Sequence, residues 1–536
     1  MQTAVTVAPR RRGSLRSLLA QVRIEAPTLT DVGVALFTSL LLVLSFPDFN
    51  LWPLAWIAVT PLLFAVARRP SPSRAFAMGW ITGTVFFYGS CYWLTYSMIH
   101  FGGLNTVVAY LLLVPGALVL GLFPAMFAMV LALAFRRWNN KAIFLAPVIW
   151  TATEWARLGV TGQLWNAIGY SQSYEPALIQ AARWGGVYMV GFLMITVSSA
   201  VTFALLNRCR RALIISATCL FGIAMLIAIA YATRVDSHES STTPDLLVVA
   251  IQPNVPMNPS QAAAHMRELI EMHLSESAKA LQQLPKDRPR LVIWPESPMN
   301  FAYGTDPELQ SRLADFTREN HTALLFNSQE PAPGNGLYNS AILINEEGKR
   351  ISQYDKIRLL PFGEYVPLPH WLPGSSLITA LVGDFAAGDK YTLLQIGPVK
   401  AGVFICIESA YPSIARTFAS EGADVLINIS NDGYLGPTAV MRQHLANAIF
   451  RAVENGRTLL RVTNSGISAF ITSSGQIKDE TGSFQTATRI WTISGTQSVP
   501  SFYTKHGDWF VLICSIVSLM VLTSLIVPKA VNRRYE

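Results

Sequence analysis

Apolar residues gather in eight long stretches, seven in the first 232 residues and one near the C-terminus. They span residues 31–49, 51–68, 75–97, 106–135, 142–157, 186–206, 212–232 and 508–527. A helix needs about 20 apolar residues to cross a bilayer, so most of these stretches are long enough to be membrane helices. The alternative for any one of them is a buried core helix or a signal-peptide core. The pattern as a whole predicts a polytopic α-helical membrane domain.

The spacing of apolar positions changes between residues 245 and 497. Short β-rich runs alternate there with amphipathic helical patterns. Strands are predicted at 246–251, 291–294, 323–326, 340–344, 392–396, 402–406, 425–429, 459–462, 468–471 and 490–493, and helices at 260–283, 307–320, 412–421 and 438–455. Many strands are apolar at consecutive positions, which indicates burial on both faces. We therefore expect one α/β domain whose sheets are covered by helices.

Basic residues mark every second loop between the apolar stretches. They lie in the N-terminal segment, in the loops after the second, fourth and sixth stretches, and in the C-terminal tail. By the positive-inside rule, we expect both termini to be cytoplasmic and the α/β domain to face outward, into the periplasm if the cell is Gram-negative. The predicted organisation is a cytoplasmic segment (1–30), a membrane domain of about seven helices (31–232), an outward-facing α/β domain (245–497), a C-terminal membrane helix (508–527) and a cytoplasmic tail (528–536).

The composition agrees with a membrane protein. The chain is 51% hydrophobic and 14% charged, whereas soluble proteins carry about 25% charged residues. The net charge of +8 does not indicate nucleic-acid binding, because residues 246–500 hold 20 Lys and Arg against 23 Asp and Glu, and the rest of the chain holds 21 against 10. The excess of positive charge therefore belongs to the inner-leaflet loops. We find no phosphate-binding loop, zinc-ligand spacing or nucleic-acid motif, and expect no cofactor or metal.

Three polar side chains follow strand-like runs in the α/β domain: Glu296, Lys356 and Cys406. The other four cysteines lie in or beside apolar stretches. A thiol must lose its proton before it attacks a carbonyl carbon, and a carboxylate can accept that proton. A lysine can stabilise the thiolate and then the tetrahedral oxyanion. The three residues predict a thiol acyl-transfer site that needs no histidine.

Each of the three residues also has a purely structural interpretation. Glu296 could be a surface or capping carboxylate, Lys356 a solvated lysine and Cys406 an inert buried thiol. Taken together with their flanking residues, the three favour a catalytic site. His444, on the predicted helix 438–455, could approach the site, but an ordinary helix-face histidine is the preferred interpretation.

The motifs around these residues resemble those of the nitrilase (carbon–nitrogen hydrolase) superfamily. They are Trp-Pro-Glu at 294–296, Tyr-x-Lys at 354–356 with Pro-Phe-Gly-Glu-Tyr at 361–365, and Cys-x-Glu at 406–408. With membrane helices around it, the domain is similar to the apolipoprotein N-acyltransferases in particular. Further matches include Asn339-Ser340, Ser430-Asn431-Asp432-Gly433 and Arg461-x-Thr463-Asn464-Ser465-Gly466. Ile407 replaces a usual aromatic residue, and Tyr434-Leu435 a usual aromatic pair.

The resemblance implies a nitrilase-like αββα sandwich in which Cys406 is the nucleophile, Glu296 the general base and Lys356 the stabiliser of the oxyanion. It also implies supporting roles for Glu364 and Glu408. The implied reaction is a ping-pong transfer. An acyl chain passes from a phospholipid, typically phosphatidylethanolamine, to Cys406 as a thioester, and then to the N-terminal amine of S-diacylglyceryl-cysteine on an apolipoprotein. Such an enzyme matures lipoproteins in the bacterial inner membrane, without metal or cofactor.

Residues 368–383 are apolar yet contain Pro and Gly, and they include Trp371, Leu377 and Leu381. A soluble enzyme rarely exposes such a group of side chains, so we expect a hydrophobic lid that contacts lipid. A loop packed on its own domain is the alternative. Two other functions stay open from the sequence: a membrane-tethered nitrilase-type amidase acting on a small amide, and a non-catalytic scaffold or transporter.

Overall fold

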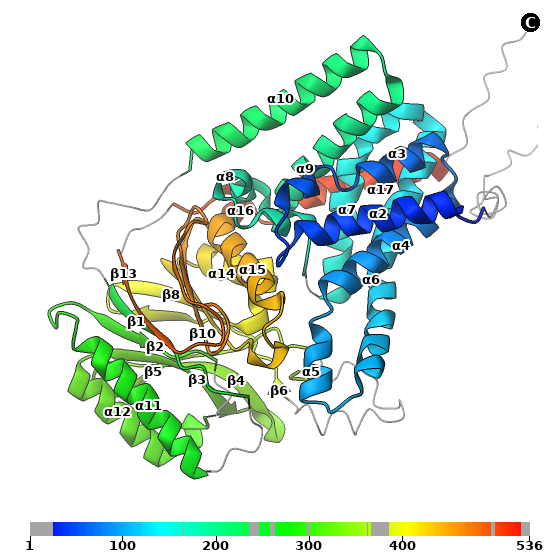
Figure 1. Ribbon diagram of the computed structural model, residues 1–536. Coiled ribbons are helices and arrows are strands. Elements are labelled where there is room, and N and C mark those ends of the chain that lie inside the picture. Colours follow the sequence, from blue (N-terminus) through cyan, green and yellow to red (C-terminus); the bar gives the residue numbers. More distant parts are fainter. Residues whose placement is uncertain are drawn as a thin grey trace, which may run out of the picture.

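The computed structural model describes residues 25–162, 164–234, 246–257, 263–296, 301–361, 363–365, 385–494 and 499–526. They form a helical part and an α/β part that lie against each other (Figure 1). The longer helices of the helical part are α2 (Leu29–Ser45), α3 (Thr60–Arg68), α4 (Pro72–Ser90), α5 (Leu94–His100), α6 (Thr106–Trp138), α7 (Ala146–Thr161), α9 (Ala182–Asn207), α10 (Arg210–Ala232) and α17 (Trp509–Ile526). Short helices connect them: η1 (Trp52–Trp56), η2 (Asn139–Leu145), η3 (Ile168–Gln172), α8 (Pro176–Ile179) and α16 (Phe502–His506).

Helices occupy all eight stretches that the apolar pattern predicts. Within the described residues, three helical segments are long and apolar enough to cross a membrane: Thr106–Thr161, Ala182–Asn207 and Arg210–Ala232. Three shorter apolar helices lie at Leu29–Ser45, Trp52–Arg68 and Trp509–Leu525. The polytopic helical membrane domain is thus confirmed as a fold class, whereas the number of crossings stays a prediction.

The α/β part contains two mixed sheets. Its strands are β1 (Leu246–Gln252), β2 (Arg290–Ile293), β3 (Ala323–Pro331), β4 (Leu337–Ile344), β5 (Arg350–Asp355), β6 (Phe385–Ala386), β7 (Leu393–Ile396), β8 (Val399–Ile405), β9 (Val425–Ser430), β10 (Thr458–Thr463), β11 (Ala469–Ile471), β12 (Ile477–Glu480) and β13 (Ala487–Ile493). The first sheet has the order β13-β1-β2-β3-β4-β5, with β6 beside β4, and the second the order β12-β11-β10-β9-β8-β7. Strands β1, β2 and β3 are parallel, as are β8, β9 and β10.

The two sheets pack face to face between two layers of helices (Figure 1). Alternate residues of β1 point to opposite faces, as a strand requires. Val249 and Ile251 pack with helices α11 (Ala263–Leu281) and α12 (Pro307–Asn320), whereas Val248 and Ala250 belong to the core shared with the second sheet. Helices α14 (Pro412–Ser420) and α15 (Val440–Asn455) cover the other face of that sheet. This arrangement is the αββα sandwich that the family resemblance implies, and it confirms the helix-covered sheets that the apolar pattern predicts.

Three strands were not expected from the sequence: β5, β6 and β12. Strands β5 and β12 lie at the outer ends of their sheets and are largely polar, for example Arg-Ile-Ser-Gln-Tyr-Asp in β5. An edge strand needs no apolar run, because only one side of its backbone pairs and much of its surface meets solvent. Strand β5 forms by pairing with β4, and β12 by pairing with β11. The pattern of apolar residues alone does not predict either strand.

Helix α15 lies between the second sheet and the helical part (Figure 1). All of its residues except Arg442 are buried. It ends at Gly456, whose φ of +61° is the left-handed conformation that favours glycine at a helix C-terminus. This buried helix is the main element of the α/β part that meets the helical part.

Candidate active site

The candidate catalytic residues stand where strands end. Glu296 follows β2, Lys356 follows β5 and Cys406 follows β8. The carboxyl ends of parallel strands meet at one edge of a sheet, and loops at that edge carry functional side chains. The two facing sheets therefore bring these residues to one site, together with Asn431 after β9.

Lys356 lies between two carboxylates. Its Nζ donates to Oε1 of Glu364 at 2.8 Å and to Oε1 of Glu296 at 3.4 Å. Asn339 Nδ2 bridges the same two oxygens, at 2.9 Å from Glu296 and 2.7 Å from Glu364. The other oxygen of Glu296 accepts from Asn431 N at 3.0 Å. Glu296, Lys356 and Glu364, all predicted site residues, thus form one hydrogen-bonded cluster.

The charges of this cluster fix the state of the lysine. Burial would lower the pKa of Lys356, which is only 1% exposed, but Glu296 and Glu364 outweigh that effect and hold its pKa well above the usual lysine value. Lys356 is therefore a permanent cation at neutral pH. A fixed cation of this kind can stabilise an oxyanion without reorganising.

Cys406 begins a sharp turn from β8 into helix η6 (Cys406–Ala410). Its φ is +53°, a left-handed value that is uncommon for a non-glycine residue and that often occurs at functional sites. The side chain is 4% exposed. Burial raises the pKa of the thiol, Glu296 raises it further, and Lys356 opposes the rise. The resting residue is thus a neutral thiol that needs a base.

Glu408 ties the Cys406 turn to the Lys356 loop. Its Oε2 accepts from Ile405 N at 2.8 Å, and its Oε1 accepts from Ile357 N at 2.8 Å and Arg358 N at 3.0 Å. The Tyr354 hydroxyl donates to the same carboxylate. Burial raises the pKa of Glu408 from 4.5 to about 7, although these hydrogen bonds favour the charged form. A structural supporting role fits this carboxyl, which is fully buried.

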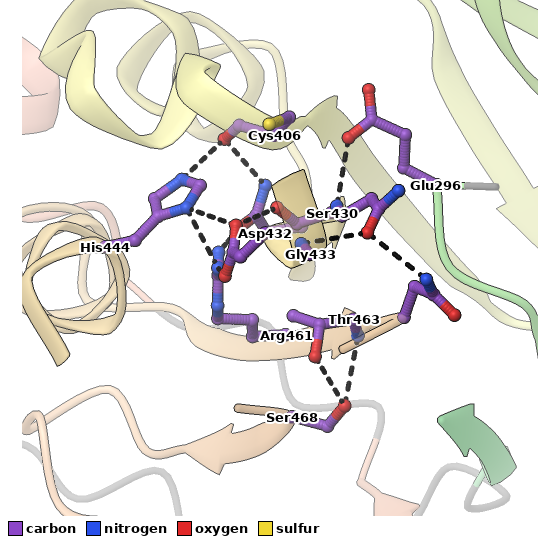
Figure 2. A network of polar contacts seen from close by, with 12 residues as sticks. Glu296, Cys406, Ser430, Asp432, Gly433, His444, Arg461, Thr463 and Ser468 are labelled. Carbon is purple, nitrogen blue, oxygen red and sulfur yellow. Dashed lines mark hydrogen bonds and ion pairs between the residues drawn. The ribbon is translucent and has the colours of Figure 1, made fainter. Parts of the chain in front are cut away.

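Polar residues behind Cys406 complete the site (Figure 2). His444 Nε2 lies 3.0 Å from the carbonyl oxygen of Cys406, and its Nδ1 lies 2.8 Å from Asp432 Oδ1. Arg461 Nη2 donates to Asp432 Oδ2 at 2.7 Å. The preferred interpretation of His444, an ordinary helix-face residue, was wrong, and the alternative, that it approaches the site, agrees with these contacts. Its proximity to Asp432 and Cys406 depends on how α15 packs on the sheet. The spacing of apolar residues along the helix does not predict that packing.

Asn339, Asn431, Asp432 and Arg461 were present in the sequence only as motif matches without assigned roles. The structure shows that Asn339 and Asn431 contact Glu296, and that Asp432 and Arg461 contact His444. Trp371, Leu377 and Leu381, the expected lid residues, lie outside the described residues. Among the residues that are described, no group of three or more His, Cys, Asp or Glu side chains is arranged to hold a metal ion.

Two family models match the chain. Residues 38–200 match the apolipoprotein N-acyltransferase N-terminal domain, and residues 248–500 match carbon-nitrogen hydrolase. A protein named apolipoprotein N-acyltransferase from Geobacter metallireducens is 32% identical over 515 residues, which cover 94% of this chain and 97% of that protein. One of the same name from Azotobacter vinelandii is 31% identical, over 89% of this chain and 91% of its own length. Among solved structures, an amidase from Nesterenkonia sp. is similar at 19% identity and a TM-score of 0.37, over 52% of this chain and 97% of that one.

Proposed function

This chain belongs to the apolipoprotein N-acyltransferase family and is a membrane acyltransferase of lipoprotein maturation, and on that premise we propose that Cys406, Glu296 and Lys356 carry its reaction. The observation that supports this assignment best is the Glu296–Lys356–Glu364 cluster beside a buried thiol at a strained turn. Cys406 is the nucleophile, Glu296 the general base and Lys356 the oxyanion stabiliser.

In the first half-reaction, Glu296 accepts the thiol proton as Cys406 Sγ attacks the ester carbonyl carbon of a phospholipid. The new C–S bond leaves negative charge on the carbonyl oxygen, which Lys356 stabilises. The C–O bond to glycerol then breaks, and Glu296 returns the proton to the leaving alkoxide. A lysophospholipid departs, and the acyl chain remains on Cys406 as a thioester.

In the second half-reaction, the α-amino group of the lipoprotein's S-diacylglyceryl cysteine attacks the thioester carbonyl. Glu296 accepts a proton from the amine, and Lys356 stabilises the second oxyanion. The C–S bond breaks, the amide forms, and the proton returns to the thiolate of Cys406. Because the resting thiol has a raised pKa, regenerating the neutral thiol is favourable.

Glu364 and Glu408 have supporting roles in this proposal. Glu364 accepts a hydrogen bond from Lys356 and so keeps the lysine ammonium between the carboxylates of Glu296 and Glu364. Its second oxygen accepts from Leu360 N at 2.7 Å, which fixes the carboxylate to the loop after Lys356. Glu408 fixes the backbone on both sides of the site. Both residues act through the positions of Lys356 and Cys406, and neither is assigned a proton-transfer step.

The finer assignments are part of the same proposal. The acyl donor is a phospholipid, with phosphatidylethanolamine as the expected one, and the acceptor is a diacylglyceryl-apolipoprotein. Residues 31–232 and 508–527 form the membrane domain of an inner-membrane protein, and residues 245–497 form its periplasmic catalytic domain. The basic loops on one side of the apolar stretches support this orientation. The segment with Trp371, Leu377 and Leu381 acts as the lipid-facing lid.

The test is the mass of the protein itself. Purified enzyme in vesicles of labelled phospholipid, without acceptor, should gain the mass of one acyl chain, and hydroxylamine should remove it. Cys406→Ser should gain none. Glu296→Gln should load about 10²- to 10⁴-fold more slowly, and Lys356→Met about 10²- to 10³-fold more slowly.

The exposed Glu421 changed to Gln is the matched control and should load at the wild-type rate. A wild-type protein that never gains the acyl mass would overturn the assignment of Cys406. Release of ammonia from small amides without acyl loading would instead favour the amidase alternative.

A further inference from the structure

Two neighbouring residues of α15, Gln443 and His444, contact different parts of the molecule. Both are buried, at 4% and 2% exposure. His444 contacts the nucleophile's backbone, whereas Gln443 contacts the helical part. One turn of one helix therefore connects Cys406 with the membrane domain.

His444 holds the carbonyl group of Cys406 in place. A carbonyl oxygen only accepts hydrogen bonds, so the His444 Nε2 that lies 3.0 Å away carries the hydrogen. Asn428 Nδ2 is a second donor to this oxygen, at 3.4 Å. The carbonyl carbon and Cβ are both bonded to the Cα of Cys406, which lies in a tight left-handed turn with a φ of +53°. A group that holds the carbonyl oxygen therefore restrains this turn and the position of Cβ, from which Sγ projects.

The histidine is itself held in place. Its Nδ1 lies 2.8 Å from Asp432 Oδ1 and 3.1 Å from Arg461 Nη2. Asp432 is fixed in turn by the Ser430 hydroxyl at 3.0 Å and by Arg461. Figure 2 shows His444 between the Cys406 carbonyl oxygen and the Asp432 carboxylate. The ring has little freedom to turn, as expected of a positioning group and not of a mobile acid or base.

Gln443 joins this assembly to the helical part. Its Oε1 accepts from the indole nitrogens of Trp93 at 3.1 Å and Trp165 at 3.0 Å. Its Nε2 donates to the carbonyl oxygens of Pro47 at 3.1 Å and Ser90 at 3.0 Å. The ring of Trp165 also packs against His444, with 5.6 Å between ring centroids. Three separate segments of the helical part thus meet one amide side chain.

We propose that His444 is a positioning residue for Cys406, and that Gln443 makes this positioning depend on the docking of the catalytic domain on the membrane helices. The proposal rests on the assignment of Cys406 as the nucleophile. Its physical basis is that the nucleophile, the histidine and the docking glutamine are joined by direct contacts, without an intervening loop. The thiol is then correctly oriented only while the catalytic domain is packed against the membrane domain.

A pair of conservative variants separates the two contacts of the histidine. In His444→Asn, the side-chain nitrogen can take the place of Nδ1 and keep the contact with Asp432. The asparagine side chain is too short to reach the carbonyl oxygen of Cys406, so that hydrogen bond is lost. In His444→Gln, the nitrogen can take the place of Nε2 and keep the bond to the Cys406 carbonyl oxygen. Met441→Leu is a volume-conserving control on the same helix, one turn before His444 and 3% exposed.

The readout is acyl loading of the full-length protein in phosphatidylethanolamine vesicles, as kcat and KM. We expect His444→Asn to lower kcat about 100-fold, the effect of misplacing a reacting group by about 1 Å, with KM within about twofold. His444→Gln should stay within about tenfold of wild type, and Met441→Leu should match wild type. Equal losses in both histidine variants, a greater loss in His444→Gln, or a change confined to KM would overturn the proposal.

The role of Gln443 is tested by combining variants. Gln443→Leu should lower kcat for loading about tenfold, and should add no further loss in the His444→Asn background, because both act through the same carbonyl group. Independent, multiplicative losses would overturn the coupling. Wild-type protein run in parallel keeps the two proposals apart. Absence of loading in wild type contradicts the nucleophile assignment, whereas normal loading in both wild type and His444→Asn contradicts only the positioning role.

Discussion

The thiol of Cys406 is kept neutral in the resting site even though a lysine lies nearby. Burial and the Glu296 carboxylate raise the pKa of the thiol, and Lys356 offsets only part of that rise. The ammonium of Lys356 is itself engaged by Glu296 and Glu364. In the proposed mechanism, sulfur becomes nucleophilic only as its proton moves to Glu296, so deprotonation and attack belong to one event.

This electrostatic state predicts the pH dependence of Cys406 alkylation. The thiolate fraction rises about tenfold per pH unit below the pKa of a thiol, and the pKa of Cys406 is raised. Its reaction with iodoacetamide should therefore keep accelerating from pH 7 to pH 10, as followed by peptide mass mapping. Lys356→Met should react more slowly at each pH, because the substitution removes an interaction that favours the thiolate.

A cysteine peptide is the reference for that measurement, since an ordinary thiol has a pKa near 8.5 and levels off above it. Alkylation of Cys406 that levels off below pH 9 would contradict a raised pKa for this thiol.

Glu408 predicts a specific loss of stability. In Glu408→Gln, the amide nitrogen must face the Ile405 N–H or the N–H groups of Ile357 and Arg358, and a buried donor is left unsatisfied. Such a loss costs about 2 kcal/mol, or about 5 °C in the thermal midpoint of a domain of this size. Thermal unfolding followed by tryptophan fluorescence measures it, with Glu421→Gln as the exposed control.

The sign of the pH effect on Glu408 follows from its raised pKa. The carboxyl has a pKa of 4.5 in the unfolded chain and about 7 in the folded one, so its contribution to stability is full below pH 4.5. That contribution is lost as the pH rises to 7. The difference in midpoint between wild type and Glu408→Gln should therefore be larger at pH 5 than at pH 8. The opposite order would rule out a protonated, buried Glu408.

The sequence identified the candidate catalytic residues better than the residues that hold them in place. Glu296 and Cys406 are recognisable because each stands at the end of a predicted strand, and Lys356 because it stands in the Tyr-x-Lys motif. Glu408 could be named only through the family resemblance, because its role depends on backbone N–H groups brought together from two loops. His444 was misjudged for the same reason, since its partner is a carbonyl oxygen 38 residues away in the chain.

At the scale of elements, local signals predicted helices and buried strands well. Asp306 accepts from Leu309 N at 3.0 Å and starts α12, and Gly456 ends α15, as capping chemistry leads one to expect. The edge strands β5 and β12 escaped prediction because their residues are polar. Lys356 stands directly after β5, so the strand that the hydropathy pattern missed is one that positions the site.

The lid is a further prediction at this scale. Trp371→Ser combined with Leu377→Asp or Leu381→Asp should slow acyl loading from vesicles and leave the thermal midpoint unchanged, because an apolar surface that meets lipid is lost. Ile351→Ser, on edge strand β5, removes an exposed apolar side chain elsewhere on the catalytic domain and is the control. Unchanged loading from the bilayer in the lid variants would show that this segment does not admit the acyl chain.

At the scale of the whole molecule, the basic loops predict on which side of the membrane each part lies. Native Cys209 is exposed and follows the sixth apolar stretch, so it should react with a membrane-impermeant maleimide only after spheroplasts are permeabilised. A cysteine placed at the exposed Glu421 should react in intact spheroplasts. Labelling of both positions, or of Cys209 alone, before permeabilisation would contradict a periplasmic catalytic domain.

The buried, uncharged sulfur of Cys406 has a consequence for the lifetime of the enzyme. Peroxide and disulfide exchange act on accessible thiolates, and Cys406 is only 4% exposed and is not ionised in the resting enzyme. In the orientation proposed above, no cytosolic reductant could repair a damaged nucleophile. The same burial that makes a general base necessary for catalysis therefore also protects the enzyme from chemical ageing between turnovers.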